Sequence, residues 1–307
     1  MTALLRVTRV GPSATIQDRG RFGALHHGIS ASGPMDRGAF ERAGAALPAA
    51  GPEGIEFTRA GIDFTVEGGP VGVALGGGGF TVKLNGEVRS WPAVLPLKSG
   101  DRVEVTPGAA GNYGYARFDL SIDVPTVIGS RATNLVAGLG GLGGRALRAG
   151  DALPLVAAAP AGGDSHRSAA AGPEPGDDAP IRFVWGLHAD LFPAAVRATF
   201  ATASFVVSQR LDRMGVRLTD GQGVFAGAPI LSLVSDAIVP GDVQILGDGT
   251  PIVLMRDHQP TGGYPRIGTV ISADLDRFAQ MRPGTRLAFM PVSLHKAREI
   301  YLASGAR

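Results

Sequence analysis

The chain has 307 residues, a formal net charge of only +2 and no cysteine. This length suggests about two domains with a sizeable core, and the lack of cysteine excludes disulfides, thiolate nucleophiles and sulfur-ligated metals. The basic residues are scattered, so no nucleic-acid partner is expected. No apolar run approaches the length that spans a membrane, and the N-terminus lacks the apolar core of a signal peptide. With no disulfides, a cytoplasmic protein is expected.

The N-terminal half predicts mostly β-strands. Glycine supplies 46 of the 307 residues, which favours turns over long helices. Asn85-Gly86 indicates a hairpin, because Asn-Gly supplies the two positive φ angles of a type I′ turn. One helix is expected over 36–47, with Asp36 as its N-cap. The predicted strands are 4–10, 80–84, 87–88 and 102–105.

Residues 157–180 are rich in Ala, Pro and Gly and have almost nothing to bury, which predicts a flexible linker. This linker separates an N-terminal lobe, 1–156, from a C-terminal lobe, 181–307. Pro193 must lie in the first turn of its helix or break it. The predicted strands of the second lobe are 181–185, 204–208, 230–234, 243–246, 251–255 and 286–292. Its predicted helices are 188–200, 273–281 and 293–302, with Ser272 and Ser293 as caps.

The densest polar segment is 256–265, with the sequence RDHQPTGGYP. It follows an apolar run that predicts a buried strand, and its prolines and glycines forbid a helix. A rigid strand therefore delivers many hydrogen-bonding groups to one loop, and such loops usually carry binding or catalysis. The alternative is a turn whose polar groups only satisfy each other.

Three other polar segments leave alternatives open. Segment 15–23 either lines a pocket or forms a turn braced by an ion pair between Asp18 and Arg21. In segment 209–215, arginine suits the bidentate grip of a carboxylate or phosphate, but an ion pair between Asp212 and an arginine is the stronger interpretation. Segment 28–36 either presents serines to an anion beside a helix N-terminus or merely caps that helix. The serines concerned are Ser30 and Ser32.

Several common sites are excluded. The glycines of 138–143 match a dinucleotide fingerprint, but Gly150 would end the helix that this fingerprint requires. Glycines 76–79 lack the Lys-Ser/Thr of a phosphate-binding loop. The histidines have no metal-ligand spacing, so no metal cluster is expected. No lysine lies in a Met-Lys-Met context, so the chain does not resemble a carrier of covalent biotin.

Taken in order, the polar segments resemble the family of the 5-oxoprolinase C subunit. This family is also described as allophanate hydrolase subunit 2-like, or as biotin-dependent carboxyltransferase domain proteins. The resemblance covers about residues 5 to 293. The matching segments are 15–21 (TIQDRGR), 28–36 (GISASGPMD), 123–131 (DVPTVIGSR), 140–145 (GGLGGR), 212–218 (DRMGVRL) and 257–265 (DHQPTGGYP).

The resemblance implies a mainly β fold with a few short helices, built as two cyclophilin-like β-barrel lobes. It implies a protein that acts with partner A and B subunits, the complex using ATP to cleave 5-oxoproline, a small amide substrate, to glutamate. A related domain fused in urea carboxylase moves carboxylate from carboxybiotin to urea, which is the main alternative. A further relative antagonises an inhibitor of a sporulation histidine kinase, so a non-catalytic module that regulates a partner protein is a third.

Both family reactions act on an amide or urea group and generate oxyanions, which need aligned donors and a nearby acid or base. On this basis Asp257, His258 and Tyr264 are the expected catalytic residues. The expected substrate-binding residues are Gln17, Asp18, Arg213, Gln259, Thr261, Gly262 and Gly263. We expect one pocket between the lobes to gather them. We also expect the loop to be exposed, so that substitutions of Asp257 or His258 lower turnover but change stability little.

One departure from the family pattern stands out. Family members usually carry a Gly-Gly pair just before the Val124-Pro125 step, and here that place holds Leu120-Ser121. If the pair lets a ligand or partner backbone approach, this chain is altered at that point.

Overall fold

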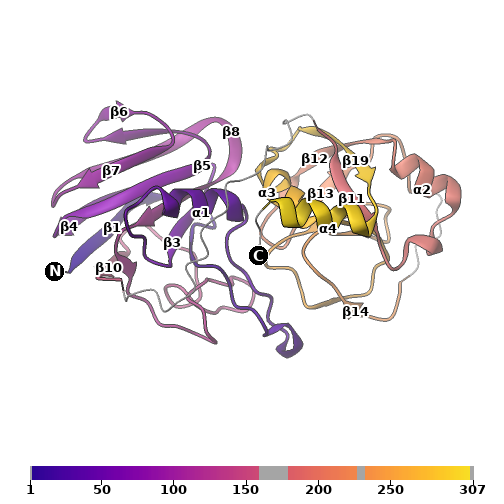
Figure 1. Cartoon of the computed structure of the whole chain (residues 1–307), viewed down its shortest axis with the longest axis horizontal. Coiled ribbons are helices and arrows are strands. Elements are labelled where there is room, and N and C mark those ends of the chain that lie inside the picture. Colours follow the sequence, from indigo (N-terminus) through magenta and orange to yellow (C-terminus); the bar gives the residue numbers. More distant parts are fainter. Residues whose placement is uncertain (1, 159–178, 227–231, 305–307) are drawn as a thin grey trace. The chain divides into compact units, whose positions relative to one another are not determined.

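The computed structural model describes residues 2–158, 179–226 and 232–304 (Figure 1). The chain divides into two compact units, one of Met1–Ala24 with Ala31–Ser168 and the other of Leu25–Ser30 with Ala169–Arg307. The predicted linker at 157–180 lies almost entirely outside the described residues, and so does the boundary between the units. The short segment Leu25–Ser30, which the sequence assigned to the N-terminal lobe, groups with the second unit.

The first unit is built on a ten-stranded sheet with the order β2-β3-β8-β4-β1-β10-β9, and β5 pairs with β8 and carries β6 and β7. Its pairs are antiparallel, and the sheet forms a half-barrel around an apolar core. The strands are β1 (Ala3–Val10), β2 (Thr15–Gln17), β3 (Gly54–Thr58), β4 (Ile62–Gly68), β5 (Val71–Leu84), β6 (Glu87–Arg89), β7 (Ala93–Leu97), β8 (Arg102–Phe118), β9 (Ser121–Ile122) and β10 (Ala152–Val156).

Local chemistry sets two features of this unit as the sequence predicts. Asn85 and Gly86 have φ angles of 53° and 85°, and the strands on either side pair as a hairpin. Helix α1 (Arg37–Ala45) begins after Asp36, whose carboxylate accepts a hydrogen bond from the Ala39 amide at 2.8 Å. The expected hairpin and helix cap are therefore confirmed.

The second unit is a closed barrel with the strand order β11-β18-β15-β16-β13-β12-β19, plus a small ribbon of β14 and β17. Phenylalanines fill its core, and the rings of Phe200 and Phe289 stack with their centroids 4.9 Å apart. The strands are β11 (Ile181–Trp185), β12 (Ser204–Leu211), β13 (Gly215–Thr219), β14 (Asp236–Ala237), β15 (Asp242–Ile245), β16 (Pro251–Leu254), β17 (Thr261–Gly262), β18 (Arg266–Val270) and β19 (Arg286–Pro291).

The helices of the second unit correct some expectations. Pro193 breaks the helix predicted over 188–200 into a 3-10 turn, η2 (Ala189–Leu191), and helix α2 (Ala194–Phe200). Ser293 caps α4 (Leu294–Ala303) by accepting from the Lys296 amide, as predicted. Ser272 is wrong as a cap, because it is the first residue inside α3 (Ser272–Gln280).

One predicted strand fails. Of 230–234, the first two residues lie outside the described ones, and 232–234 are not in a strand. The mainly β fold class is otherwise confirmed, with a half-barrel sheet in one unit and a closed barrel in the other. Within the described residues, no helix is both long and apolar enough to cross a membrane.

Candidate functional site

The loop at 256–265 follows β16 and divides into a buried half and an accessible half. Asp257 and His258 are only 1% and 4% exposed, whereas Tyr264 is 41% exposed. The expectation that Asp257 and His258 lie on an exposed loop is therefore wrong. Both residues lie within four positions of the end of β16, where the chain is still buried although it has left the strand.

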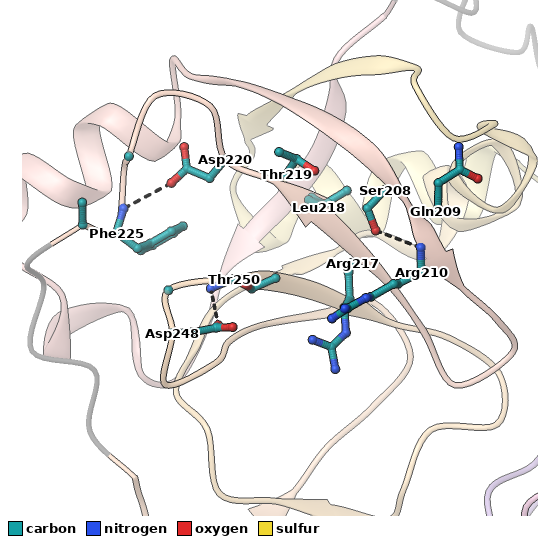
Figure 2. A pocket seen from close by; sticks show the side chains of 13 residues that line it. Ser208, Gln209, Arg210, Arg217, Leu218, Thr219, Asp220, Phe225, Asp248 and Thr250 are labelled. Carbon is teal, nitrogen blue, oxygen red and sulfur yellow. Dashed lines mark hydrogen bonds between the residues drawn. The ribbon is translucent and has the colours of Figure 1, made fainter.

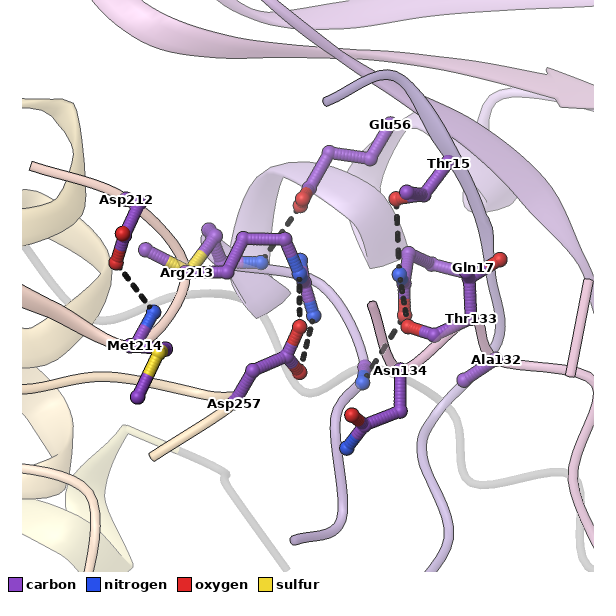
Figure 3. Close-up of polar contacts among 12 residues, drawn as sticks. Thr15, Gln17, Glu56, Ala132, Thr133, Asn134, Asp212, Arg213, Met214 and Asp257 are labelled. Atoms are coloured by element: carbon purple, nitrogen blue, oxygen red, sulfur yellow. Dashed lines mark hydrogen bonds and ion pairs between the residues drawn. The ribbon is translucent and has the colours of Figure 1, made fainter. Parts of the chain in front are cut away.

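Asp257 forms a bidentate ion pair with Arg213, which belongs to the turn between β12 and β13 (Figure 3). The guanidinium donates from Nε to one carboxylate oxygen at 2.8 Å and from Nη2 to the other at 3.0 Å. The Asp257 amide also donates to the Arg213 carbonyl at 2.7 Å. Two turns that lie 44 residues apart in the sequence are thus joined by backbone and side chain at once.

The preferred ion pair of Asp212 with an arginine is wrong. Its carboxylate accepts from the amides of Met214 and Gly215 at 2.8 and 3.1 Å, which closes the turn. Arg213 and Asp257 are both almost fully buried, and two charges out of water are tolerated when each satisfies the other with good geometry. We infer that this pair holds the loop in place, since the carboxylate is already occupied by a guanidinium.

His258 is the candidate acid/base group of the loop. Its Nδ1 lies 2.6 Å from the Gln259 carbonyl oxygen. A carbonyl can only accept, so Nδ1 carries the proton and Nε2 of the neutral ring keeps a lone pair. Burial lowers the pKa of His258, which favours this neutral form. The ring is therefore in the protonation state of a general base.

The accessible half of the loop forms a short ribbon. Thr261 and Gly262 pair with Ala237 and Asp236, and the Gly263 carbonyl accepts from the Leu233 amide at 2.7 Å. The hydroxyls of Thr261 and Tyr264 lie on exposed residues, so they remain available as donors.

Gln244 in β15 is a polar residue of this region that sequence reasoning missed. A Cβ on Gly262 would lie 2.5 Å from its Nε2, so the glutamine side chain lies directly against the loop backbone. Gln244 is 1% exposed, and its Nε2 has no hydrogen-bond partner among the described residues. Buried amides are nearly always satisfied, so this one demands an explanation. The available signal was a glutamine between Val243 and Ile245 in a buried strand.

Arg266, directly after the loop, was also missed. It donates to the Ala237 carbonyl at 2.7 Å and to the Asp236 carboxylate at 2.6 Å. Arg266 therefore stabilises the ribbon of β14 and β17 through both residues of β14. Its amide approaches Nδ1 of His188 at 3.3 Å. Burial, and then the charge of Arg266, lower the pKa of His188.

In the first unit, Gln17 and Asp18 are engaged in internal contacts. Gln17 donates to the Thr15 hydroxyl and the Thr133 carbonyl at 2.9 and 3.0 Å, and it accepts from the Gly33 amide at 3.1 Å (Figure 3). Asp18 accepts from one hydroxyl and two backbone amides. The donors are Ser130 Oγ (2.6 Å), Arg131 N (2.6 Å) and Gly20 N (2.9 Å). Their role in substrate binding stays a prediction.

A buried tyrosine organises the segment before α1. The Tyr115 hydroxyl donates to Glu56 at 3.0 Å and accepts from the Asp36 amide at 2.8 Å. Burial raises the pKa of Tyr115 well above its usual range, so it stays protonated. Ser30 and Ser32 are both buried. Ordinary capping by Asp36 therefore accounts for the helix start.

Leu120-Ser121, which replaces the Gly-Gly pair usual in the family, takes part in the hydrogen bonding of the first unit. The Ser121 hydroxyl donates to buried Glu53 at 2.8 Å and accepts from Arg131 at 2.9 Å, while Arg131 also pairs with Glu53. A glycine would remove this hydroxyl bridge. In the part of the chain that the structure describes, no group of three or more histidine or carboxylate side chains is placed to hold a metal.

The mainly β fold, with a half-barrel sheet, a closed barrel and the loop at 256–265, is typical of a carboxyltransferase domain. The sequence matches the carboxyltransferase domain family, subdomain A and B, over residues 27–291, and the chain belongs to this family. The family membership expected from the polar segments is thereby confirmed.

Two bacterial proteins resemble the chain over nearly their whole length. It is 34% identical to the 5-oxoprolinase C subunit of Escherichia coli (strain K12), with 96% of this chain and 93% of that protein aligned. It is 33% identical to the 5-oxoprolinase C subunit of Haemophilus influenzae, with 97% and 96% aligned.

Larger relatives contain the chain as one part. It is 27% identical to urea amidolyase of Lachancea kluyveri, of which it spans 17%. The crystal structure of Kluyveromyces lactis urea amidolyase superimposes with a TM-score of 0.83 at 25% identity, over 96% of this chain and 19% of that one.

Proposed function

We propose that the chain is the C subunit of an ATP-dependent 5-oxoprolinase, which opens the lactam of 5-oxoproline to give glutamate together with A and B subunits. The observation that carries this proposal is the near-full-length identity to two 5-oxoprolinase C subunits. The sequence has no Walker-type glycine loop, so the proposal assigns ATP hydrolysis to the partner subunits.

In this proposal the loop at 256–265 binds the substrate, with its exposed hydroxyls as donors and the buried His258 as the base. Attack on a lactam carbonyl generates an oxyanion, which aligned hydroxyl and amide donors stabilise. Thr261 and Tyr264 supply exposed hydroxyls, and Nε2 of His258 supplies a lone pair for proton transfer. Asp257 is a positioning residue, because Arg213 occupies its carboxylate.

The test is reconstitution with homologues of the A and B subunits. The isolated chain is expected to form a stable complex with the B homologue and to release no glutamate from 5-oxoproline and ATP by itself. The assembled complex should be active. Full turnover by the single purified chain, or an active A–B complex that gains nothing from this chain, would refute the proposal.

Within the active complex, Tyr264→Phe should lower turnover by about 10²-fold, the usual scale for removing one oxyanion donor. Its stability should hardly change, because Tyr264 is 41% exposed. Tyr301→Phe is the matched control, since Tyr301 is another exposed tyrosine, on α4. Equal turnover of the two variants would remove Tyr264 from the chemistry.

Carboxyl transfer to urea is the second candidate, favoured by the identity to urea amidolyase and the fold shared with its solved structure. It predicts that a carboxylated biotin carrier is consumed in the presence of the chain and urea. Consumption of this kind, without any glutamate formed from 5-oxoproline in the reconstituted complex, would decide for the second candidate.

A further inference from the structure

A second site lies on the second unit, away from the loop at 256–265. It is a pocket of about 580 Å³ between β12, β13, the turn that follows β13 and the β15–β16 turn (Figure 2). None of the loop residues lines it. Its two basic members are Arg210 on β12 and Arg217 on β13, and Figure 2 shows their side chains close to each other.

A β-bulge brings the two arginines to one pocket. The β12–β13 pairing runs through Val207↔Leu218, breaks, and resumes at Leu211↔Val216. The three residues 208–210 of β12 thus stand against the single Arg217 of β13, and bulges commonly re-aim a side chain.

The guanidinium groups are donors without acceptors. Among the described residues, neither Arg210 nor Arg217 makes a side-chain hydrogen bond or ion pair, although each guanidinium carries five N–H donors. The amide of Arg210 donates to the Ser208 hydroxyl at 3.1 Å, which fixes the bulge. The pocket therefore presents many hydrogen-bond donors.

The two carboxylates of the pocket serve its turns. Asp220 accepts from the amides of Gln222 and Phe225 at 3.1 and 3.3 Å. Asp248 accepts from the Thr250 amide at 2.9 Å, and this bond is the main reason that the pKa of Asp248 is lowered. The Thr250 side chain and, more weakly, the charge of Arg217 also lower that pKa. The carboxylates are thus committed to the turns, whereas the guanidinium N–H donors remain open to a ligand.

We propose that this pocket binds a small molecule through its phosphate group. A phosphate dianion offers enough oxygens for two guanidinium forks, whereas one carboxylate would satisfy a single fork and leave the second arginine unpaired. The hydroxyl of Thr219 lines the same pocket and can bind a further oxygen. The volume lies within the range of about 300–1,000 Å³ typical of small-molecule sites, so it holds more than the phosphate itself. This inference does not rest on the proposed 5-oxoprolinase activity.

The experiment is calorimetric titration of the full chain with inorganic phosphate, with ATP and with L-glutamate. Saturable binding of phosphate or ATP, and weaker or no binding of glutamate, is expected. ATP binding more tightly than phosphate would identify a nucleotide, whereas equal affinities would identify the phosphate group alone as the recognised part.

Arg210→Gln and Arg217→Gln should each raise the Kd by about 10-fold or more, as expected for lost hydrogen bonds to a charged group. Arg298→Gln removes the same charge from an exposed position on α4 and should bind like the wild type. The proposal is overturned by the absence of saturable phosphate or ATP binding, by unchanged affinity in both pocket variants, or by tighter binding of glutamate than of either phosphate compound. Far-UV melting curves confirm that the variants are folded.

Discussion

Arg213 and Arg217 lie four positions apart on one β-hairpin and have opposite surroundings. Arg213 is 4% exposed and bound to Asp257 through two hydrogen bonds. Arg217 is partly exposed, lines a pocket and makes no side-chain hydrogen bond or ion pair within the described residues. A buried charge must be paired within the fold, whereas a charge in contact with water needs no protein partner and is available to bind a ligand. The burial of an arginine side chain is therefore needed to decide whether it has a structural role or is available to bind a ligand.

The largest expected effect tests the buried pair. Asp257→Asn leaves the Arg213 charge buried and poorly paired, and should cost about 3–5 kcal/mol of unfolding free energy. Asp190→Asn breaks a matched Asp–Arg pair whose carboxylate is 93% exposed, and should cost at most about 1 kcal/mol. Urea unfolding of both variants measures the difference. A small effect of Asp257→Asn would mean that the pair does not hold the loop, whereas Arg213→Met with Asp257→Leu should recover much of the loss.

Two buried glutamines allow the same comparison between paired and unpaired groups to be made with uncharged side chains. Gln244 has an amide nitrogen without a partner among the described residues, so Gln244→Met should raise stability by about 1 kcal/mol or more. Gln17 makes three hydrogen bonds, so Gln17→Met should lower stability by about 1–3 kcal/mol. Thermal and urea unfolding report both. If Gln244→Met destabilises the protein like Gln17→Met, Gln244 has a structural partner in solution.

A smaller effect is expected on the pH dependence of stability, through the protonation of His258. Burial lowers the pKa of His258 below 6.5, so below that pH the unfolded chain binds more protons than the folded one. This contribution to stability is fully present above about pH 6.5 and is lost as pH falls through the lowered pKa. His258→Gln should therefore flatten the loss of unfolding free energy between about pH 8 and pH 5.

His295→Gln is the control for that experiment, because the His295 side chain is 83% exposed. It should leave the pH profile as in the wild type. Some slope should persist in His258→Gln, since burial lowers the pKa of His188 as well. A profile of His258→Gln that matches the wild type would mean that the ring gains protons equally in both states.

The smallest effect is expected at the pocket. Arg217→Gln breaks no described hydrogen bond or ion pair and loses only a weak attraction to Asp248, so unfolding free energy should change by no more than about 0.5 kcal/mol. A loss of several times that size would show that Arg217 braces the fold and would erase its contrast with Arg213.

The sequence predicts features that depend on neighbouring residues. The Asn85-Gly86 turn and the caps at Asp36 and Ser293 follow from side-chain size and hydrogen bonding within a few positions, and all three are confirmed. Ser272 has the same chemistry but lies one position too late, which pattern alone does not resolve.

Contacts between distant segments were beyond sequence reasoning. The segment of Arg213 and the loop of Asp257 were both singled out, yet the favoured partner of the arginines was the adjacent Asp212, because spacing gives no measure of distance in the fold. The burial of Asp257 and His258 was missed for the same reason. A run of polar residues after an apolar strand predicts a loop, but it does not predict how far the loop is buried.

The double link between Arg213 and Asp257 has a consequence for the timing of local opening. The Asp257 amide proton is held by the Arg213 carbonyl, and the side chains on the same two residues lock the turns together. Solvent deuterium can reach that amide only when the ion pair and both turns separate in one event. Its exchange rate therefore reports how often this wall of the barrel opens, and it should be far slower than that of any unpaired turn amide.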